Sequence, residues 1–416
     1  MKNFTLFKRQ MMFVVFMLLG CMSIHAADDG LITEQITIKL DEAGTLPDKI
    51  DDKDKYKITN LKIIGEINGT DWVLIRELAG RNHTGAQLGE PVLNTLDLSE
   101  AKIVEGGDYY YAQNYYYDEK NDVYLPEDPC YTSNDCLGDC AFAGCQWLTS
   151  LILPSDIVSI GEFAFSGCSG LTNLIIPSGV TSIGDYAFGS CGGLTSLTIP
   201  SGVTSMGDFT FKNCFGLTNL TIPSGVTSIG HFAFSGCYSL TSLTIPSSVT
   251  SIGNFAFEDC RSITSLSIPS SVTSIGSYAF RGCRSITSLS IPSSVTSIGQ
   301  EFLYGCSSLT SIYVGWLTPL NITINGYFLE PYSFMQNCKL YVPQGTSRDY
   351  KRANGWMYWG INIVEYDPTG IDKVTTSTDA KELSRYSVNG QRLSAPAKGL
   401  NIVKYSDGSV KKVAVQ

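Results

Sequence analysis

The stretch C-Y-S-L-T-S-L-T-I-P-S-S-V-T-S-I-G-N-F-A-F-E-D, residues 237–259, decides the fold because its pattern recurs with constant spacing along the chain. Eight cysteines and seven prolines mark the same interval of 23 residues. They are Cys145, Cys168, Cys191, Cys214, Cys237, Cys260, Cys283 and Cys306, with Pro154, Pro177, Pro200, Pro223, Pro246, Pro269 and Pro292. A fixed period of this size is typical of a solenoid, in which each repeat forms one turn.

Each repeat contains two short extended pieces and one compact turn. Leu240, Leu243 and Ile245 alternate with polar residues, which predicts a strand with one buried face, and Pro246 ends it because proline cannot donate to a ladder. The V-T-S-I-G piece, residues 249–253, predicts a second extended segment that the glycine turns. The next residues, 255–257, leave room for one helical or 3₁₀ turn only.

Stacking must supply the core, since a single turn cannot bury its apolar face. At a strand spacing of about 4.8 Å, eight turns give a rod roughly 40 Å long. The residues predicted to point inward are Leu240, Leu243, Ile245, Val249, Ile252 and Phe257 with their equivalents, including Phe165, Phe188, Phe211, Phe234 and Phe280.

The L-x-x-L-x-I-P and A-F-x-G-C pieces at this period resemble the BspA-like (treponemal-type) leucine-rich repeat of bacterial surface proteins. The resemblance covers residues 134–314. It implies a fold of the α/β class, rich in β-structure: a curved solenoid of 23-residue turns, each with two short strands and one helical turn, capped at both ends. It also implies adhesion or protein binding without catalysis, so we expect no enzymatic activity and no cofactor.

Charge is distributed unevenly along the 416 residues. The chain has 39 acidic and 29 basic residues, a net charge of −10. Residues 28–139 hold 24 acids and 10 bases, whereas residues 315–416 hold 8 acids and 12 bases. An acidic first half disfavours nucleic-acid binding, which needs a clustered basic face.

Residues 1–26 have the pattern of an export signal, with three basic residues before a short apolar core at 11–19. Two processing sites remain open. Leu18-Leu19-Gly20-Cys21 fits a lipobox, in which Cys21 would carry a lipid anchor; alternatively, cleavage occurs near residues 26–27. No second hydrophobic segment follows, so we expect no transmembrane segment and a location at the outer-membrane surface or outside the cell.

Three further segments flank the repeats. Residues 27–105 predict an N-terminal cap with an irregular leucine-rich turn, and residues 106–133 a tyrosine-rich acidic loop. That loop either folds over the first turns or contacts a ligand through its tyrosines, which combine contact area with hydrogen bonding at little entropic cost. These tyrosines are Tyr109, Tyr110, Tyr111, Tyr115, Tyr116 and Tyr117.

The C-terminal part divides into a cap at 315–367, a linker at 368–383 and a small β unit at 384–416. The G-Q-R and K-G-L-x-I-V pieces of this β unit resemble the C-terminal sorting domains of the type IX secretion route of Gram-negative anaerobes. That resemblance implies export to the cell surface or beyond.

No catalytic or metal-binding motif stands out. The only histidines are His25, His83 and His231, and His231 occupies a variable position that is exposed in other turns.

The repeat cysteines predict a ladder of buried thiols. In an exported protein Cys130, Cys136 and Cys140 predict a disulfide; zinc bound by these three and Cys145 is the alternative, although it lacks C-x-x-C spacing.

The residue after each repeat cysteine varies most, and there Phe215, Tyr238, Arg261 and Arg284 fall on consecutive turns, with Arg281 at the adjacent edge. Aromatic residues with arginine are typical of interface hot spots; the alternative is neutral variation at an exposed position.

We expect a monomer that binds a host or bacterial surface protein of the extracellular-matrix type. The competing hypothesis is a glycan-capture lipoprotein that uses the tyrosine-rich loop and Trp147.

Overall fold

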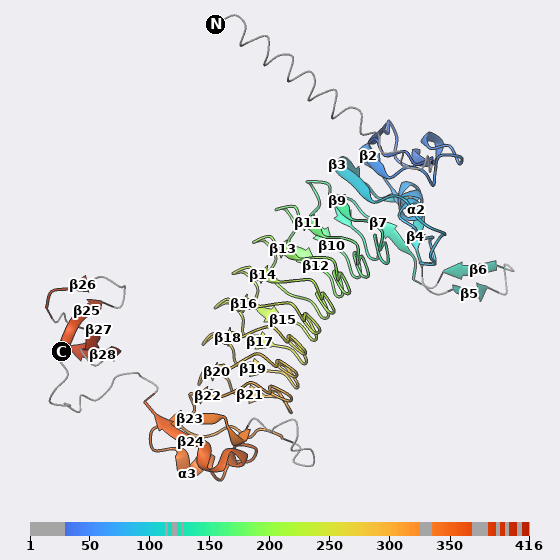
Figure 1. Ribbon diagram of the computed structural model, residues 1–416. Helices are drawn as coiled ribbons and strands as arrows, with labels where there is room; N and C mark the ends of the chain where they lie inside the picture. Colours follow the sequence, from blue (N-terminus) through green and yellow to red (C-terminus); the bar gives the residue numbers. More distant parts are fainter. Residues whose placement is uncertain are drawn as a thin grey trace, which may run out of the picture.

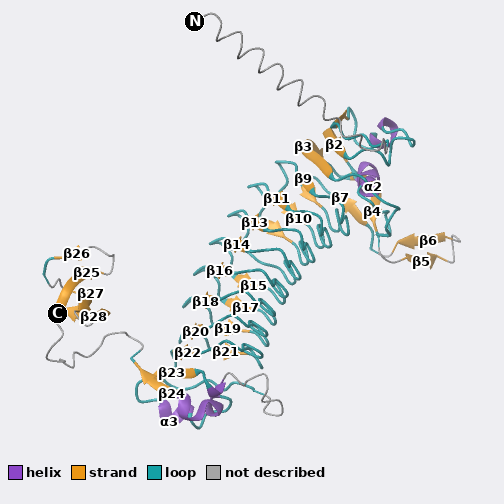
Figure 2. Cartoon of the chain, viewed as in Figure 1, coloured by secondary structure: helices purple, strands orange, loops and turns teal. Residues whose placement is uncertain are grey.

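The computed structural model describes residues 30–112, 115–118, 123–126, 128–324, 335–367, 382–387, 392–395, 399–405 and 410–415. The repeats stack into a curved rod with the N-terminal elements at one end and β23, β24 and α3 at the other (Figure 1). Short strands and turns make up most of the rod, and the helices lie towards its two ends (Figure 2). The predicted leucine-rich repeat solenoid is therefore confirmed.

The first side of each turn is a three- or four-residue strand in one of two parallel sheets, the first ending at Ser242–Thr244 and the second beginning at Ser265–Ser267. Strands one turn apart pair in exact 23-residue register, as Leu220 with Leu243 does. The strands are β9 (Ser150–Ile152), β11 (Asn173–Ile175), β13 (Ser196–Thr198), β14 (Asn219–Thr221), β16 (Ser242–Thr244), β18 (Ser265–Ser267), β20 (Ser288–Ile291) and β22 (Ser311–Val314). The leucine of each strand, replaced by Ile312 in β22, points inward, and the residues on either side of it are more exposed.

The second side is a column of two-residue strands. In each of these strands the second residue, an isoleucine or leucine, is more buried than the first. Neighbouring strands again pair in parallel. The strands are β8 (Cys136–Leu137), β10 (Ser159–Ile160), β12 (Ser182–Ile183), β15 (Ser228–Ile229), β17 (Ser251–Ile252), β19 (Ser274–Ile275) and β21 (Ser297–Ile298).

The third side consists of consecutive tight turns, and the predicted helical or 3₁₀ turn is wrong. Phe255 has a positive φ of 54°, which a right-handed helical turn does not contain. Glu258 N–H donates to Phe255 O at 3.0 Å, and Cys260 N–H donates to Phe257 O at 3.2 Å. The amides of Phe255 and Phe257 donate to the next turn instead, so that hydrogen bonds also join the turns on this side.

The predicted inward columns are buried except at Ile298, which is partly buried, and two of them form continuous stacks. The inner phenylalanines, residues 142–280 at intervals of 23, lie face to face with ring centroids 5.2–5.7 Å apart. From Cys168 onward, each cysteine Sγ donates to a phenylalanine carbonyl at 3.0–3.2 Å. Burial raises the pKa of these thiols, that of Cys214 to about 12, so they pack as small apolar groups.

The N-terminal cap continues the first sheet with longer strands. β1 (Ile36–Lys39), β2 (Asn60–Ile67) and β3 (Thr95–Ile103) are parallel, and β3 pairs with β9 of the first turn. The 3₁₀ helix η1 (Leu46–Lys49) and helix α2 (Gly69–Leu78) cover the open end. Asn68 caps α2 by accepting from Thr70 N–H, while Asp71 accepts from Asn68 N–H.

The tyrosine-rich segment forms strands where the sequence predicted an irregular loop. Strand β4 (Gly106–Tyr111) pairs with β7 (Cys130–Thr132) in an antiparallel ladder, and β5 (Tyr115–Asp118) pairs with β6 (Val123–Pro126). Thr70 at the start of α2 donates its hydroxyl hydrogen to Asp108 Oδ2 at 3.0 Å. This bond fastens β4 to the N-terminal cap.

The last turn of the rod is covered by aromatic residues. β23 (Lys339–Pro343) and β24 (Ile363–Tyr366) extend the sheet, with helix α3 (Ser347–Tyr350) and the 3₁₀ helix η3 (Trp356–Asn362) between them. Trp356 and Trp359 are buried there, and Tyr350 donates to Trp316 O at 2.9 Å.

The C-terminal unit is an antiparallel sheet of four strands in the order β26-β25-β27-β28. The strands are β25 (Glu382–Ser387), β26 (Arg392–Leu393), β27 (Gly399–Tyr405) and β28 (Val410–Val415). Arg385 is buried and donates to Asn401 Oδ1 at 3.2 Å. Across all the described segments, none of the helices has the length and apolarity needed to cross a membrane.

Removing one ring from the inner stack tests the core. Phe234 is fully buried between Phe211 and Phe257, so Phe234→Ala should lower the free energy of unfolding by about 3–5 kcal/mol through the cavity it leaves. Urea titration followed by circular dichroism measures this change. Ser242→Ala, at an exposed strand position, should stay within about 0.5 kcal/mol of the parent. Equal midpoints for Phe234→Ala and the parent would contradict the buried stack.

The glycine after the second strand tests how closely the turns approach. A Cβ on Gly253 would lie 2.6–2.7 Å from backbone atoms of Gly230 and His231, whereas one on Gly179 would meet nothing nearer than 3.5 Å. Gly253→Ala should therefore destabilise the chain by about 2 kcal/mol, as overpacking does, and Gly179→Ala should not. Thermal unfolding of the two variants makes the comparison. Two equally stable variants would show that the turns are free to separate.

Candidate binding surface

The residues that directly follow four repeat cysteines form what we call the aromatic–arginine row: Phe215, Tyr238, Arg261 and Arg284. Phe215 and Tyr238 stack with ring centroids 5.1 Å apart at an interplanar angle of 17°. The Arg261 guanidinium lies 4.5 Å from the centroid of the Tyr238 ring, and its Nε donates to Asp259 Oδ1 at 3.2 Å. Phe215 and Tyr238 remain 44 % and 37 % exposed. The row thus presents stacked rings and an oriented cation to solvent.

The two other arginines of this region differ in their surroundings. Arg284 is exposed one turn beyond Arg261, and no ion pair joins it to another described residue. Arg281 belongs to a separate cluster at the turn edge, where its Nη1 donates to Glu258 Oε1 at 2.8 Å. Its guanidinium also lies over the rings of Tyr278 and Tyr304. Arg281 therefore holds neighbouring turns together, while Arg284 extends the row.

The candidate tyrosines of the N-terminal region pack against the cap. Tyr110 is only 1 % exposed and donates its hydroxyl hydrogen to Asp139 O at 2.7 Å, and burial raises its pKa. Tyr110 is thereby removed from the candidate contact residues, because its side chain cannot reach a ligand. Tyr109 and Tyr111 are half-buried, Tyr111 beneath the Arg76 guanidinium at 4.9 Å. The side chains of residues 115–117 lie outside the described part of the structure, and so does Cys21.

A second aromatic column, which the sequence reasoning missed, runs along the turn edge. Its members lie two residues before the inner phenylalanines and stack with centroids 4.3–4.8 Å apart at angles of 6–10°. They are Phe163, Tyr186, Phe209, Phe232, Phe255 and Tyr278. Lys212 Nζ lies 5.1–6.0 Å from the centroids of three of these rings. An aromatic residue in every one of six repeats was the available signal, but we assigned that position to a helical turn.

Every residue of this outer column has a φ angle between 53° and 57°. Such a left-handed conformation is costly for residues other than glycine, on the order of 1 kcal/mol or more each. Stacked aromatic pairs contribute a comparable stabilisation. The outer column therefore has a structural role in holding the turn conformation.

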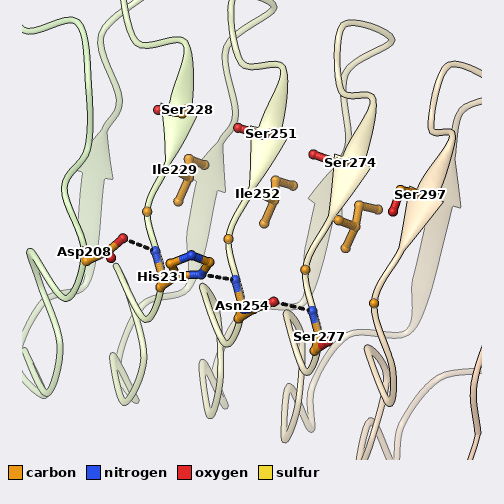
Figure 3. Close-up of a pocket in the computed structure, with 15 residues that line it drawn as sticks. Asp208, Ser228, Ile229, His231, Ser251, Ile252, Asn254, Ser274, Ser277 and Ser297 are labelled. Atoms are coloured by element: carbon orange, nitrogen blue, oxygen red, sulfur yellow. Dashed lines mark hydrogen bonds between the residues drawn. The ribbon is translucent and has the colours of Figure 1, made fainter.

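A shallow groove of about 470 Å³ follows the second strand column from Asp208 to Gly299. Ser228, Ser251, Ser274 and Ser297 form one row along it, and Figure 3 shows a second, parallel row of polar side chains. In that row Asp208 Oδ1 accepts from His231 N–H at 2.6 Å, His231 Nδ1 from Asn254 N–H at 2.8 Å, and Asn254 Oδ1 from Ser277 N–H at 2.8 Å.

This hydrogen-bond chain gives the polar residues of the groove a structural function. Each side chain accepts the amide of the next turn, which satisfies a backbone donor that the tight turn leaves unpaired. Because His231 Nδ1 is the acceptor for Asn254, the neutral tautomer with hydrogen on Nε2 is the one that fits. This row contributes to turn stacking, and the acceptor atoms of Asp208, His231 and Asn254 are already used within the protein.

The cysteines outside the repeat column are thiols in this structure, and no disulfide joins any of the described ones. Cys130 and Cys140 line the same cavity. Within the described segments no cluster of three or more histidine, cysteine or carboxylate side chains could hold a metal ion.

Comparison with solved structures finds other leucine-rich repeat proteins. A leucine-rich repeat protein of T. pallidum is 31 % identical, with 39 % of this chain and 78 % of that chain covered and a TM-score of 0.36. A leucine-rich repeat protein of Bacteroides ovatus is 19 % identical over 62 % of this chain and 90 % of that chain, with a TM-score of 0.37. A leucine-rich cell surface protein of Faecalibacterium prausnitzii is 23 % identical over 63 % and 95 %, with a TM-score of 0.32.

Among curated proteins, no significant match to the chain is found. The family model described as "BspA type Leucine rich repeat region" matches six copies over residues 135–231 and 204–340. These matched residues include the 23-residue turns whose cysteine, phenylalanine and glycine columns the structure shows stacked in register. Through its repeat region, the chain belongs to the BspA-type leucine-rich repeat family.

Proposed function

We propose that the chain is an exported surface protein that binds a protein partner through the aromatic–arginine row. The observation that carries this proposal is the exposed Phe215–Tyr238 stack with the Arg261 guanidinium fixed above it. In other repeats the equivalent position holds Ser169, Gly192 or Ser307. The side chains of the row are therefore not needed to build a turn.

Preorganisation makes the row suited to binding. Phe215 and Tyr238 are held by their mutual stacking, and Tyr238 N–H donates to Gly236 O within its own turn. Arg261 donates from Nε to Asp259, and its side chain remains 44 % exposed. A side chain that is already ordered loses less conformational entropy when a partner binds.

The chemistry of the row indicates the kind of surface it fits. Arg261 and Arg284 place two cations beside an aromatic platform on a protein whose net charge is −10. Arginine binds carboxylates with two parallel hydrogen bonds, and aromatic rings supply buried apolar area. The partner should therefore present carboxylates flanking an apolar patch.

Location outside the cell is part of the same proposal. It rests on the export signal at residues 1–26, on the resemblance of the C-terminal β unit to type IX sorting domains, and on membership of a repeat family that occurs in surface proteins. Anchoring through Cys21 and release after cleavage near residues 26–27 are both compatible with it.

Charge reversal in the row tests the proposal. The purified chain, without residues 1–27, is captured on a sensor and exposed to extracellular-matrix proteins (fibronectin, laminin and collagen) and to polysaccharides. For a saturable protein partner, Arg261→Glu with Arg284→Glu should weaken binding at least tenfold, about 1.4 kcal/mol or more. The matched control is Arg348→Glu with Arg352→Glu, which makes the same charge change at exposed residues of the C-terminal cap.

Each outcome separates the hypotheses. Binding that the control pair weakens as much as the row pair would reflect net charge and contradict a local site. Binding that neither pair of substitutions changes would favour the alternative that residues of the row vary neutrally at exposed positions. Saturable binding of polysaccharides alone, lost on substitution of the half-exposed Trp147 by alanine, would favour glycan capture instead.

A further inference from the structure

Two thiols meet where the β4–β7 ladder lies on the first turn of the rod. Cys130 is on β7 directly opposite Tyr111 of β4. Tyr110, the neighbour of Tyr111, donates to the carbonyl of Asp139, the residue before Cys140. These contacts bring the two segments together, and the Cys130 and Cys140 side chains line one cavity.

The repeat pattern explains why a cysteine fits at position 140. It lies 23 residues before Phe163, in the column of outer aromatic rings, and has the same positive φ of 55°. The column starts here, so residue 140 has no preceding ring on which to stack. A small thiol leaves open a cavity of about 420 Å³ that Cys130, Cys140, Tyr111 and Phe163 line together.

We propose that Cys130 and Cys140 are joined by a disulfide that a small disulfide oxidant installs through this cavity. The Cys130 thiolate attacks one sulfur of the oxidant, such as oxidised glutathione, and expels one thiolate. The Cys140 thiolate then attacks Cys130 Sγ in the mixed disulfide and expels the second. Two protein thiols are oxidised and one oxidant disulfide is reduced to two thiols, so electrons and atoms balance.

The surroundings of the two thiols support this order of attack. The neighbouring Cys140 thiol lowers the pKa of the Cys130 thiol, which makes Cys130 the first nucleophile. The neighbouring Cys130 raises the pKa of Cys140, so Cys140 follows as the resolving thiol once Cys130 has reacted. Both side chains are partly exposed, and the cavity gives an oxidant access.

The other described cysteines lack this combination of access and partner. The repeat cysteines are buried, and from Cys168 onward their sulfurs donate to phenylalanine carbonyls. Cys136 is in β8, within the column that holds Ser159 and Ser182 in the following turns, and its N–H donates to Ser133 O at 3.3 Å. The structure thus selects Cys130 and Cys140 from the three candidates in the sequence.

The link would connect β7 to the first repeat turn, at the junction between the N-terminal cap and the rod. It closes a loop between residues ten positions apart. Such a closure stabilises the folded state mainly by restricting the unfolded chain. This proposal does not depend on the identity of a binding partner.

Peptide mapping without reduction tests the link. The purified chain is equilibrated with mixtures of oxidised and reduced glutathione, and free thiols are alkylated under denaturing conditions. Endoproteinase Asp-N then cuts before Asp128, Asp135, Asp139 and Asp156 and places Cys130, Cys136 and Cys140 in separate fragments. We expect fragments 128–134 and 139–155 to be recovered as one linked species and fragment 135–138 to carry an alkylated Cys136.

Three variants make the result decisive. Cys136→Ser should leave the link intact, whereas Cys130→Ser and Cys140→Ser should each abolish it, the latter excluding Cys145 as the partner within fragment 139–155. The parent and Cys136→Ser should also lose thermal stability when a reductant is added, and the other two variants should not respond. Alkylated Cys130 and Cys140 in every glutathione mixture, or a link that contains Cys136, would overturn the proposal.

Discussion

The close approach of successive turns at the glycine after the second strand is the constraint on which the rest of the structure depends. A Cβ at Gly230, Gly253, Gly276 or Gly299 would lie within 2.7 Å of backbone atoms of the preceding turn. Backbone hydrogen bonds on all three sides of the turn require this approach, and it leaves each turn only one register. The 23-residue spacing holds from Cys145 to Cys306, and it changes only towards the two ends, where Ser311 of β22 pairs with Lys339 of β23 and Thr95 of β3 pairs with Ser150 of β9.

The same constraint explains why residues of different chemistry repeat in strict columns. In each column, identical side chains lie one strand spacing apart, so each must pack against the same side chain of the preceding and following turns. Aromatic rings do so by stacking face to face, and thiols do so as small buried groups bonded to a carbonyl. Asp208, His231 and Asn254 differ in chemistry, yet each accepts the amide of the next turn. The three residues share only the need for a hydrogen-bond acceptor at this position of the repeat.

The sequence predicts the features that follow from periodicity, and it predicts less where conformation depends on local backbone geometry. The solenoid and its inward leucine, isoleucine and phenylalanine columns follow directly from the spacing, and the structure confirms them. The A-F segment did not form a helical turn because Phe255 and its equivalents adopt a left-handed conformation that sequence patterns rarely assign to aromatic residues. The pairing of Cys130 with Cys140 depends on how β4 and β7 fold onto the first turn, which no repeat unit encodes.

Function in such a fold is best sought in positions that have no structural task. The strand, glycine, cysteine and inner aromatic columns are each occupied by contacts between turns, and Asp208, His231 and Asn254 of the groove already bond to backbone amides. The position after the repeat cysteine holds Ser169, Gly192 or Ser307 in other turns, so its residue can change without altering the fold of the turn. Where large side chains nevertheless gather at that position on four consecutive turns, the rod holds them at a fixed spacing. A partner that matches this spacing meets an already ordered surface, and this rigidity is what the long repeat array can contribute to recognition.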